Sequence, residues 1–291
     1  MSAPRRRVSA QLSLAAVLVF LVLASTTSLL SQPRPPAAPA AQSPTAAPST
    51  TAAPATPGAD NGVLMIADDG EAARYWPRWR GPSGQGLAAG SGYPDRWSAT
   101  ENVRWRTQVP GSGNSSPIVW RDRIYLTTAR DGGTRLSLLA FDRFTGKLAW
   151  ETSAQPGNRQ RAHPKNGYAS ATPATDGERI YVSFGSRGLY AFDLTGRQVW
   201  HRDVGDIENY HGAAGSPLLY KNRIILYQDQ EGGGFSRSGG GFVAAFDTRT
   251  GAPLWRTARE QSVGWGTPIA VRVNASTIAL RRREAMAILV S

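Results

Sequence analysis

The side chains with the clearest chemical potential lie in two polar loops and after one apolar run. His163, Asn166 and Tyr168 stand in the first loop, His211 in the second, and Asp229 follows the apolar run. Imidazole and carboxylate groups can bind a metal ion or exchange protons with a substrate. Histidines in loops also serve as surface or turn-capping residues, so these five positions are candidates for a site and do not define one.

Composition narrows the chemistry further. The chain contains no cysteine, so disulfides, thiol nucleophiles and cysteine-ligated metal sites are excluded. A formal net charge of +12 first points to nucleic acid. However, part of the excess lies in Arg5–Arg7 and Arg281–Arg283, and no element interleaves basic and aromatic residues. We therefore expect no nucleic-acid partner.

One pattern occurs three times and organises the chain. It spans Ala140–Trp150, Ala191–Trp200 and Ala245–Trp255, and its second copy is one residue shorter before the Thr-Gly pair. A period of roughly 50 residues is typical of a repeat architecture. In each copy an Ala-Phe-Asp run leads into Thr-Gly, where Asp can bind turn amides and Gly can take a positive φ. Each copy therefore predicts two strands joined by a tight turn that ends in Trp.

A second recurring element precedes each copy and completes the repeat. Its members are Ser116-Pro117, Thr172-Pro173, Ser216-Pro217 and, after the third copy, Thr267-Pro268. Each leads into a run of β-branched and aromatic residues, which in the first three copies is broken by a polar pair, a hairpin signal. About four short antiparallel strands in roughly 50 residues make one blade of a β-propeller. We predict an all-β propeller with about three complete blades and part of a fourth.

This architecture predicts where the two polar loops lie. Each lies a few residues before a Ser/Thr-Pro element, which leads into the innermost strand of a blade. His163, Asn166, Tyr168 and His211 are therefore predicted to line the mouth of the central channel, and Asp229 is a further candidate there.

The motif Ala-x-Asp-x-x-Thr-Gly-x-x-x-Trp, preceded by a Ser/Thr-Pro hairpin, resembles the tryptophan-docking repeat of pyrroloquinoline-quinone-like (PQQ-like) β-propellers. The stretch Trp76–Gly84 is also similar to the Trp-x-x-x-Arg-Gly-Pro-x-Gly opening of many such proteins. The resemblance covers about residues 75–273. It implies that each motif Trp packs on the glycine turn of the neighbouring blade. The docking residues it implies are Gly146, Trp150, Gly196, Trp200, Gly251 and Trp255, with Trp105 as the seam residue before the first blade.

The motif is structural, so it leaves the function open. The resemblance implies two alternatives. The first is an exported, non-catalytic binding or scaffold domain that needs no cofactor and meets protein partners at the cell envelope. The second is a fragment of a PQQ-dependent dehydrogenase, which would hold PQQ and Ca²⁺ at the propeller centre. The vicinal cysteine pair of many such enzymes is missing, and none of the family's calcium ligands can be matched here, so we favour the first.

The N-terminal region predicts export. Residues 1–30 join Arg5–Arg7 to an apolar run from Leu12 to Ala24, which is typical of a signal peptide. That run is short for a membrane span of about 20 residues, but an N-terminal membrane anchor remains an alternative. Residues 31–74 are largely Pro, Ala, Ser and Thr and predict a disordered linker. The expected location is the periplasm, or the outer side of a membrane that holds the anchor.

The C-terminal region departs from the repeat. Blade four begins with Gly264–Val271, but no third strand and no Asp-x-x-Thr-Gly turn follow. Residues 274–291 therefore read as an aberrant or frame-shifted tail, with a genuine short tail as the alternative.

Overall fold

The computed structural model describes residues 63–157, 160–230, 240–259, 264–273 and 286–289. All of them belong to one compact unit, Pro57–Ser291. Their only helices are three single 3₁₀ turns, η1 (Ala72–Arg74), η2 (Asp131–Gly133) and η3 (Gly185–Arg187). None of these described helices is long and apolar enough to cross a membrane. The export segment predicted for residues 1–30 lies outside the described residues.

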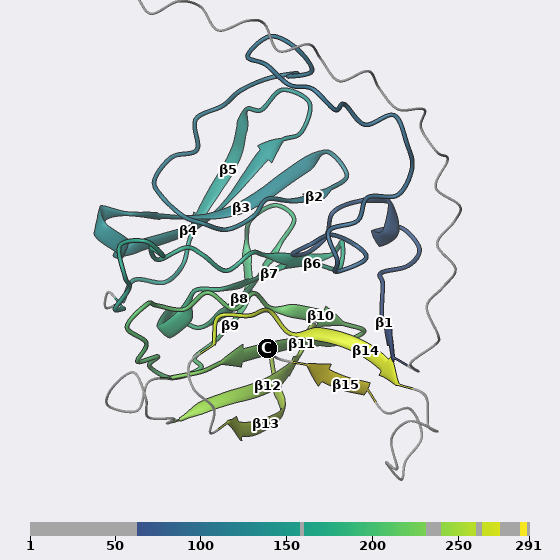
Figure 1. Cartoon of the computed structure of the whole chain (residues 1–291). Coiled ribbons are helices and arrows are strands. Elements are labelled where there is room, and N and C mark those ends of the chain that lie inside the picture. Colours follow the sequence, from purple (N-terminus) through teal and green to yellow (C-terminus); the bar gives the residue numbers. More distant parts are fainter. Residues whose placement is uncertain (1–62, 158–159, 231–239, 260–263, 274–285, 290–291) are drawn as a thin grey trace, which may run out of the picture. The chain divides into compact units, whose positions relative to one another are not determined.

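Three four-stranded antiparallel sheets follow one another along the chain and are stacked in that order (Figure 1). The first contains β2 (Ile118–Trp120), β3 (Arg123–Arg130), β4 (Arg135–Asp142) and β5 (Leu148–Ser153). The second contains β6 (Ala174–Thr175), β7 (Arg179–Ser183), β8 (Leu189–Asp193) and β9 (Gln198–Arg202). The third contains β10 (Leu218–Tyr220), β11 (Arg223–Gln228), β12 (Gly241–Asp247) and β13 (Pro253–Arg259). The predicted all-β blade architecture is confirmed.

Alternating side chains explain the stacking of the sheets. Along β7 and β8, Ile180 and Phe192 face the first sheet, whereas Tyr181 and Ala191 face the third. Because successive side chains of a strand point to opposite faces, a sheet covered on both sides has apolar residues at nearly every position. Each sheet also carries a register shift after the Ala of its Ala-Phe-Asp run, at Ala140, Ala191 and Ala245. The repeat therefore reproduces even the irregularity of its strands.

The first strands of the sheets converge through a chain of hydroxyl groups. The backbone N–H of Ser116 donates to Thr172 Oγ1 at 3.0 Å, and that of Thr172 donates to Ser216 Oγ at 2.9 Å. The backbone N–H of Ser216 in turn donates to Thr267 Oγ1 at 3.4 Å. The hydroxyl groups of Thr172, Ser216 and Thr267 thus each accept a bond from the Ser/Thr-Pro element of the preceding sheet. We call the line where these first strands meet the axial edge.

A fourth sheet contains β14 (Ile269–Val273), which pairs with β15 (Met286–Leu289) on one side and β1 (Val63–Met65) on the other. The sequence pattern places the start of ordered structure at residue 75. In the structure it lies earlier, because β1 and η1 fall within the predicted linker. In the predicted tail, β15 is described, and residues 274–285 and 290–291 lie outside the described part.

The segment 63–82, which we call the strap, runs along the axial edge. Beyond β1, it bonds to the first sheet through Trp76, which exchanges backbone bonds of 3.1 and 2.8 Å with Val119 in β2. It then meets the second sheet, where the amide of Thr175 donates to the carbonyl of Pro77 at 2.9 Å. The strap therefore covers the free backbone of the first strand in three of the four sheets.

Candidate functional site

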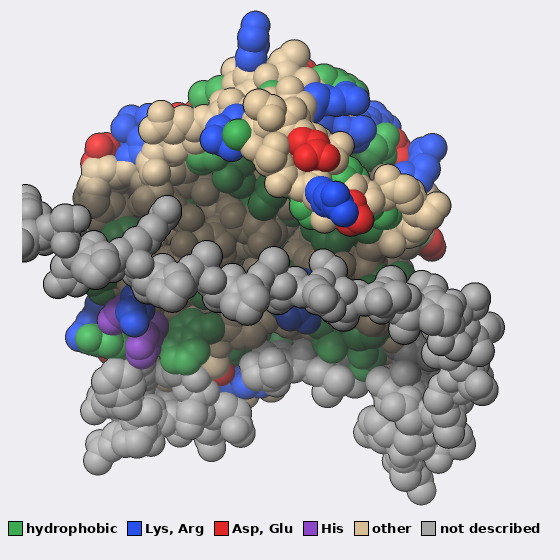
Figure 2. Space-filling model, turned by 45° about the horizontal axis from the view of Figure 1, so that its top comes forward, with side chains coloured by type: hydrophobic (Ala, Val, Ile, Leu, Met, Phe, Trp, Pro, Cys, Tyr) green, Lys and Arg blue, Asp and Glu red, His purple; other side chains and the backbone are tan. Residues whose placement is uncertain are grey.

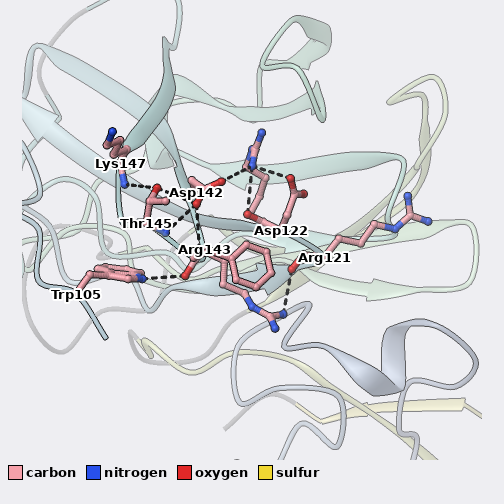
Figure 3. Close-up of polar contacts among 9 residues, drawn as sticks. Trp105, Arg121, Asp122, Asp142, Arg143, Thr145 and Lys147 are labelled. Atoms are coloured by element: carbon pink, nitrogen blue, oxygen red, sulfur yellow. Dashed lines mark hydrogen bonds and ion pairs between the residues drawn. The ribbon is translucent and has the colours of Figure 1, made fainter. Parts of the chain in front are cut away.

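The docking turn of the first sheet is built around one carboxylate (Figure 3). Asp142 Oδ1 accepts bonds from the amide and the hydroxyl of Thr145, both at 2.8 Å. The amide of Gly146 donates to the Asp142 carbonyl at 2.9 Å, which closes the turn. The indole N–H of Trp105 then donates to the carbonyl of Arg143 at 2.9 Å. Local turn chemistry thus presents a backbone carbonyl to an indole from another part of the chain.

The same contact recurs between sheets. The ring of Trp105 lies directly on Gly146, where a side chain would collide with it. A methyl group on Gly196 would come within 2.8 Å of Trp150 Cε3. These glycines have positive φ, so they meet two demands at once, the left-handed turn and the close approach of a ring.

The third pair is Trp200 and Gly251. A methyl group on Gly251 would lie 2.7 Å from Trp200 Cδ2, and the Trp200 indole donates to the carbonyl of Thr248 at 2.9 Å. Trp255, the last motif indole, instead packs partly buried against a cluster that includes Leu218 and Ala270.

The turn aspartates have lowered pKa values. For Asp142 the bonds from the hydroxyl and then the amide of Thr145 lower the pKa, and for Asp247 the amide and hydroxyl of Thr250 do so. Burial would raise the pKa of Asp193, but bonds from Thr195 and Arg197 together lower it. Hydrogen bonds to the charged form stabilise it. The carboxylates therefore stabilise their turns in the ionised form.

The opposite ends of the sheets carry the loops with the candidate residues, and three of these residues meet. The rings of His163 and His211 lie 5.4 Å apart between centroids. Asn166 Nδ2 donates to the carbonyl of His211 at 2.7 Å, while its own carbonyl accepts from Asn114 Nδ2 at 2.6 Å. Asn166 is therefore a clamp between loops of successive sheets.

The other two candidates lie in different surroundings. The Tyr168 ring packs on Gly133 in η2, where a side chain would collide with it. The Asp229 carboxylate is 2% exposed and forms an ion pair with Arg259, with Nε and Oδ1 2.8 Å apart. The amide of Gly264 donates to its Oδ2 at 3.2 Å. Asp229 therefore ties β13 and the segment before β14 to the end of β11.

Two residues that the sequence reasoning did not single out for this face complete the histidine pair. The rings of Tyr210 and Trp265 each lie 5.0 Å from the ring of His211, and the Trp265 indole donates to the carbonyl of Gly212 at 3.2 Å. Trp265 stands two residues before the Thr-Pro of the fourth sheet, a position that could have marked it. Histidine, cationic and apolar side chains gather on one part of the surface in Figure 2.

The described side chains do not form a metal centre. Over the ranges that the structure describes, no three His, Asp or Glu residues come together in a metal-binding group. Calcium binds about six to eight oxygen ligands. The buried carboxylate of Asp229 could serve as one such ligand, but it already accepts hydrogen bonds from Arg259 and from a backbone amide. In this structure the Asp229 carboxylate is thus held by protein partners.

Two curated relatives resemble this chain at low identity. Polyvinylalcohol dehydrogenase of a Pseudomonas species is 25% identical over 167 residues, 55% of this chain and 25% of that protein. The outer membrane protein assembly factor BamB of Burkholderia pseudomallei is 26% identical over 200 residues, 61% of this chain and 46% of that protein. The chain thus spans a quarter to just under half of the length of these relatives.

Comparison with solved structures also finds an alcohol dehydrogenase and a BamB protein. Quinohemoprotein alcohol dehydrogenase from Comamonas testosteroni has a TM-score of 0.37 at 21% identity, over 51% of this chain and 21% of that one. BamB from Moraxella catarrhalis has a TM-score of 0.34 at 19% identity, over 58% of this chain and 61% of that one.

A family match also covers much of the chain. The pattern of the family described as outer membrane protein assembly factor BamB matches residues 87–262, which is more than half of the chain. The predicted PQQ-like repeat is confirmed by this match. The chain therefore belongs to the family described as outer membrane protein assembly factor BamB.

Proposed function

We propose that this protein is an exported, non-catalytic PQQ-like propeller that acts as a binding or scaffold domain for protein partners at the cell envelope. The low-identity relatives include both an assembly factor and dehydrogenases, so they support the family without choosing between these activities. The arrangement of the described residues favours the scaffold. The dehydrogenase fragment is the alternative.

The observation that carries the proposal is the strap on the axial edge. A quinone at the propeller centre would need free space and polar ligands where the first strands meet. That edge instead binds the chain's own backbone, through Trp76 on β2 and Pro77 on β6. A surface that presents loops to a partner needs no such space.

The strap is fixed in place by one arginine. The Arg78 side chain, 8% exposed, pairs with Asp68 at 2.9 Å between Nε and Oδ2. Its Nη2 also donates to the carbonyls of Ile66 and Pro82, at 3.1 and 2.9 Å. Burial of Asp68 raises its pKa, although Arg78 acts in the opposite direction. A buried guanidinium is costly unless its N–H groups are hydrogen-bonded, and the strap itself supplies all of these acceptors. Arg78 therefore fixes the conformation of the strap.

The test is direct. The purified full chain is incubated with PQQ and Ca²⁺, desalted and examined for retained quinone absorbance, and then assayed for dye reduction with alcohols and sugars. We expect neither retention nor turnover. Retained quinone with turnover would overturn the proposal in favour of the dehydrogenase alternative.

Export is tested separately. Alkaline phosphatase, which is active only after it leaves the cytoplasm, is fused after residue 62. We expect activity from this fusion and none from a matched fusion that lacks residues 1–30. Equal inactivity of both fusions would contradict the envelope location.

A further inference from the structure

Three successive inter-sheet loops meet in one row of aromatic rings. The row consists of His163 in the first loop, Tyr210 and His211 in the second, and Trp265 in the third. Centroid distances are 5.4 Å for His163 and His211, 5.6 Å for His163 and Tyr210, and 5.0 Å for His211 and Trp265. We call it the aromatic row. No single repeat contains it, because each loop supplies only part.

The aromatic row is held in place by hydrogen bonds to backbone carbonyls of its second loop. Asn166 fixes the carbonyl of His211, and Trp265 donates to the carbonyl of Gly212. Gly212 has a φ of 85°, and a methyl group there would lie 3.0 Å from Ala162 Cβ, so the loops approach closely at this point. Preorganised rings lose little conformational entropy when they bind a partner.

The row is accessible and carries positive charge at one end. Trp265 is 41% exposed. The guanidinium of Arg161 lies 4.7 Å from the centroid of the Tyr210 ring, and Lys165 is exposed beside His163. Neither cation forms an ion pair with a described residue. Aromatic residues and arginine dominate binding energy at protein interfaces.

We propose that the aromatic row, together with Arg161 and Lys165, is a docking site for an extended acidic segment of a partner protein. Carboxylates of that segment pair with the two cations, and an apolar or aromatic side chain packs on Trp265. The inference rests on the proposed scaffold function and names the chemistry of its partner. A nucleic-acid strand fits less well, because two cations provide no track for successive phosphates.

The test uses fluorescein-labelled ten-residue peptides and fluorescence anisotropy with the full chain. The probe alternates Asp and Phe, and the comparison peptides alternate Asp with Ser and Lys with Phe. A 15-nucleotide oligothymidine tests the competing class. The protein variants are Trp265→Ala, Arg161→Glu and Lys165→Glu. Matched controls are Trp97→Ala, at a tryptophan that is 66% exposed elsewhere, and Arg106→Glu, at another exposed arginine.

We expect the Asp-Phe peptide to bind best, with Kd at least roughly fivefold weaker in each site variant and within about twofold of the parent in both controls. Near-UV circular dichroism of every variant checks the fold, and the two charge reversals at exposed positions remain informative if Trp265→Ala unfolds. Equal loss in the controls, no loss in the site variants, or stronger binding of the lysine peptide or the oligothymidine would each overturn the inference. None of these outcomes depends on quinone, so failure here is distinguishable from failure of the scaffold proposal.

Discussion

The contact between Trp200 and Gly251 makes a quantitative prediction about how neighbouring sheets are held together. In Gly251→Ala the new methyl group would lie 2.7 Å from the Trp200 ring at a backbone φ of +68°. Left-handed backbone costs a non-glycine residue about 1 kcal/mol. Overpacking against a buried ring adds about 1–3 kcal/mol. We therefore expect a loss of about 2–4 kcal/mol in the free energy of unfolding.

Gly167→Ala separates the two contributions. Gly167 has a φ of +73°, and nothing lies within 4 Å of a methyl group there. This control should cost only the backbone contribution of about 1 kcal/mol. In a Trp200→Ala background, Gly251→Ala should also cost only about 1 kcal/mol, because the ring that it strikes is gone.

The measurement is equilibrium unfolding in urea, followed by far-UV circular dichroism so that loss of an indole does not change the signal. The three variants of the cycle, the control and the parent are compared, and unchanged m-values show that the variants alter stability and not the surface exposed on unfolding. If Gly251→Ala costs no more than Gly167→Ala, or if the cycle is additive, the indole does not press on the glycine turn and the docking argument is refuted.

Three further predictions concern other parts of the fold. Ser216→Ala removes the acceptor for the buried amide of the preceding sheet and should cost about 1–3 kcal/mol in urea unfolding, against at most about 0.5 for exposed Ser91→Ala. Equal costs would show that the hydroxyl chain does not link the sheets. Asp229→Ala leaves its arginine partner without a counter-ion and should lower the free energy of unfolding by about 3 kcal/mol. The chain near β13 should also lose its protection from proteolysis. An unchanged melting temperature would contradict this. The pKa values of Asp142, Asp193 and Asp247 are lowered in the folded state, so their stabilisation is complete above the unfolded value of about 3.9 and disappears as pH falls through the folded value. Melting temperatures between pH 2 and 6 should therefore decline less steeply in the triple Asp→Asn variant, and parallel curves would refute this.

Much of the fold can be predicted from interactions between residues that are close in the sequence. The Asp, Thr and Gly of each turn interact within a few residues, so their spacing predicts the turn before any sheet is known. The sequence also predicts that the Ser/Thr-Pro elements begin strands, but it does not show that their hydroxyl groups accept bonds from the preceding sheet. Their partners lie about one repeat away, and only stacked sheets bring them within hydrogen-bonding distance.

The candidate site was harder to predict because its members come from different repeats. His163 and His211 are residue types that can do chemistry, and their rings lie together in the structure. Asp229, chosen for the same reason, is held by Arg259 at the end of β13. Sequence spacing does not show which charged partner will satisfy a buried carboxylate.

The sequence by itself determined the period, the strand order within a repeat and the chemistry of each turn, because these depend on neighbours along the chain. The tertiary structure alone decided that the strap lies on the axial edge and that three loops join in one aromatic row. Both arrangements depend on how far each sheet is rotated and stacked against the next, which is set by the packing of buried side chains from different sheets.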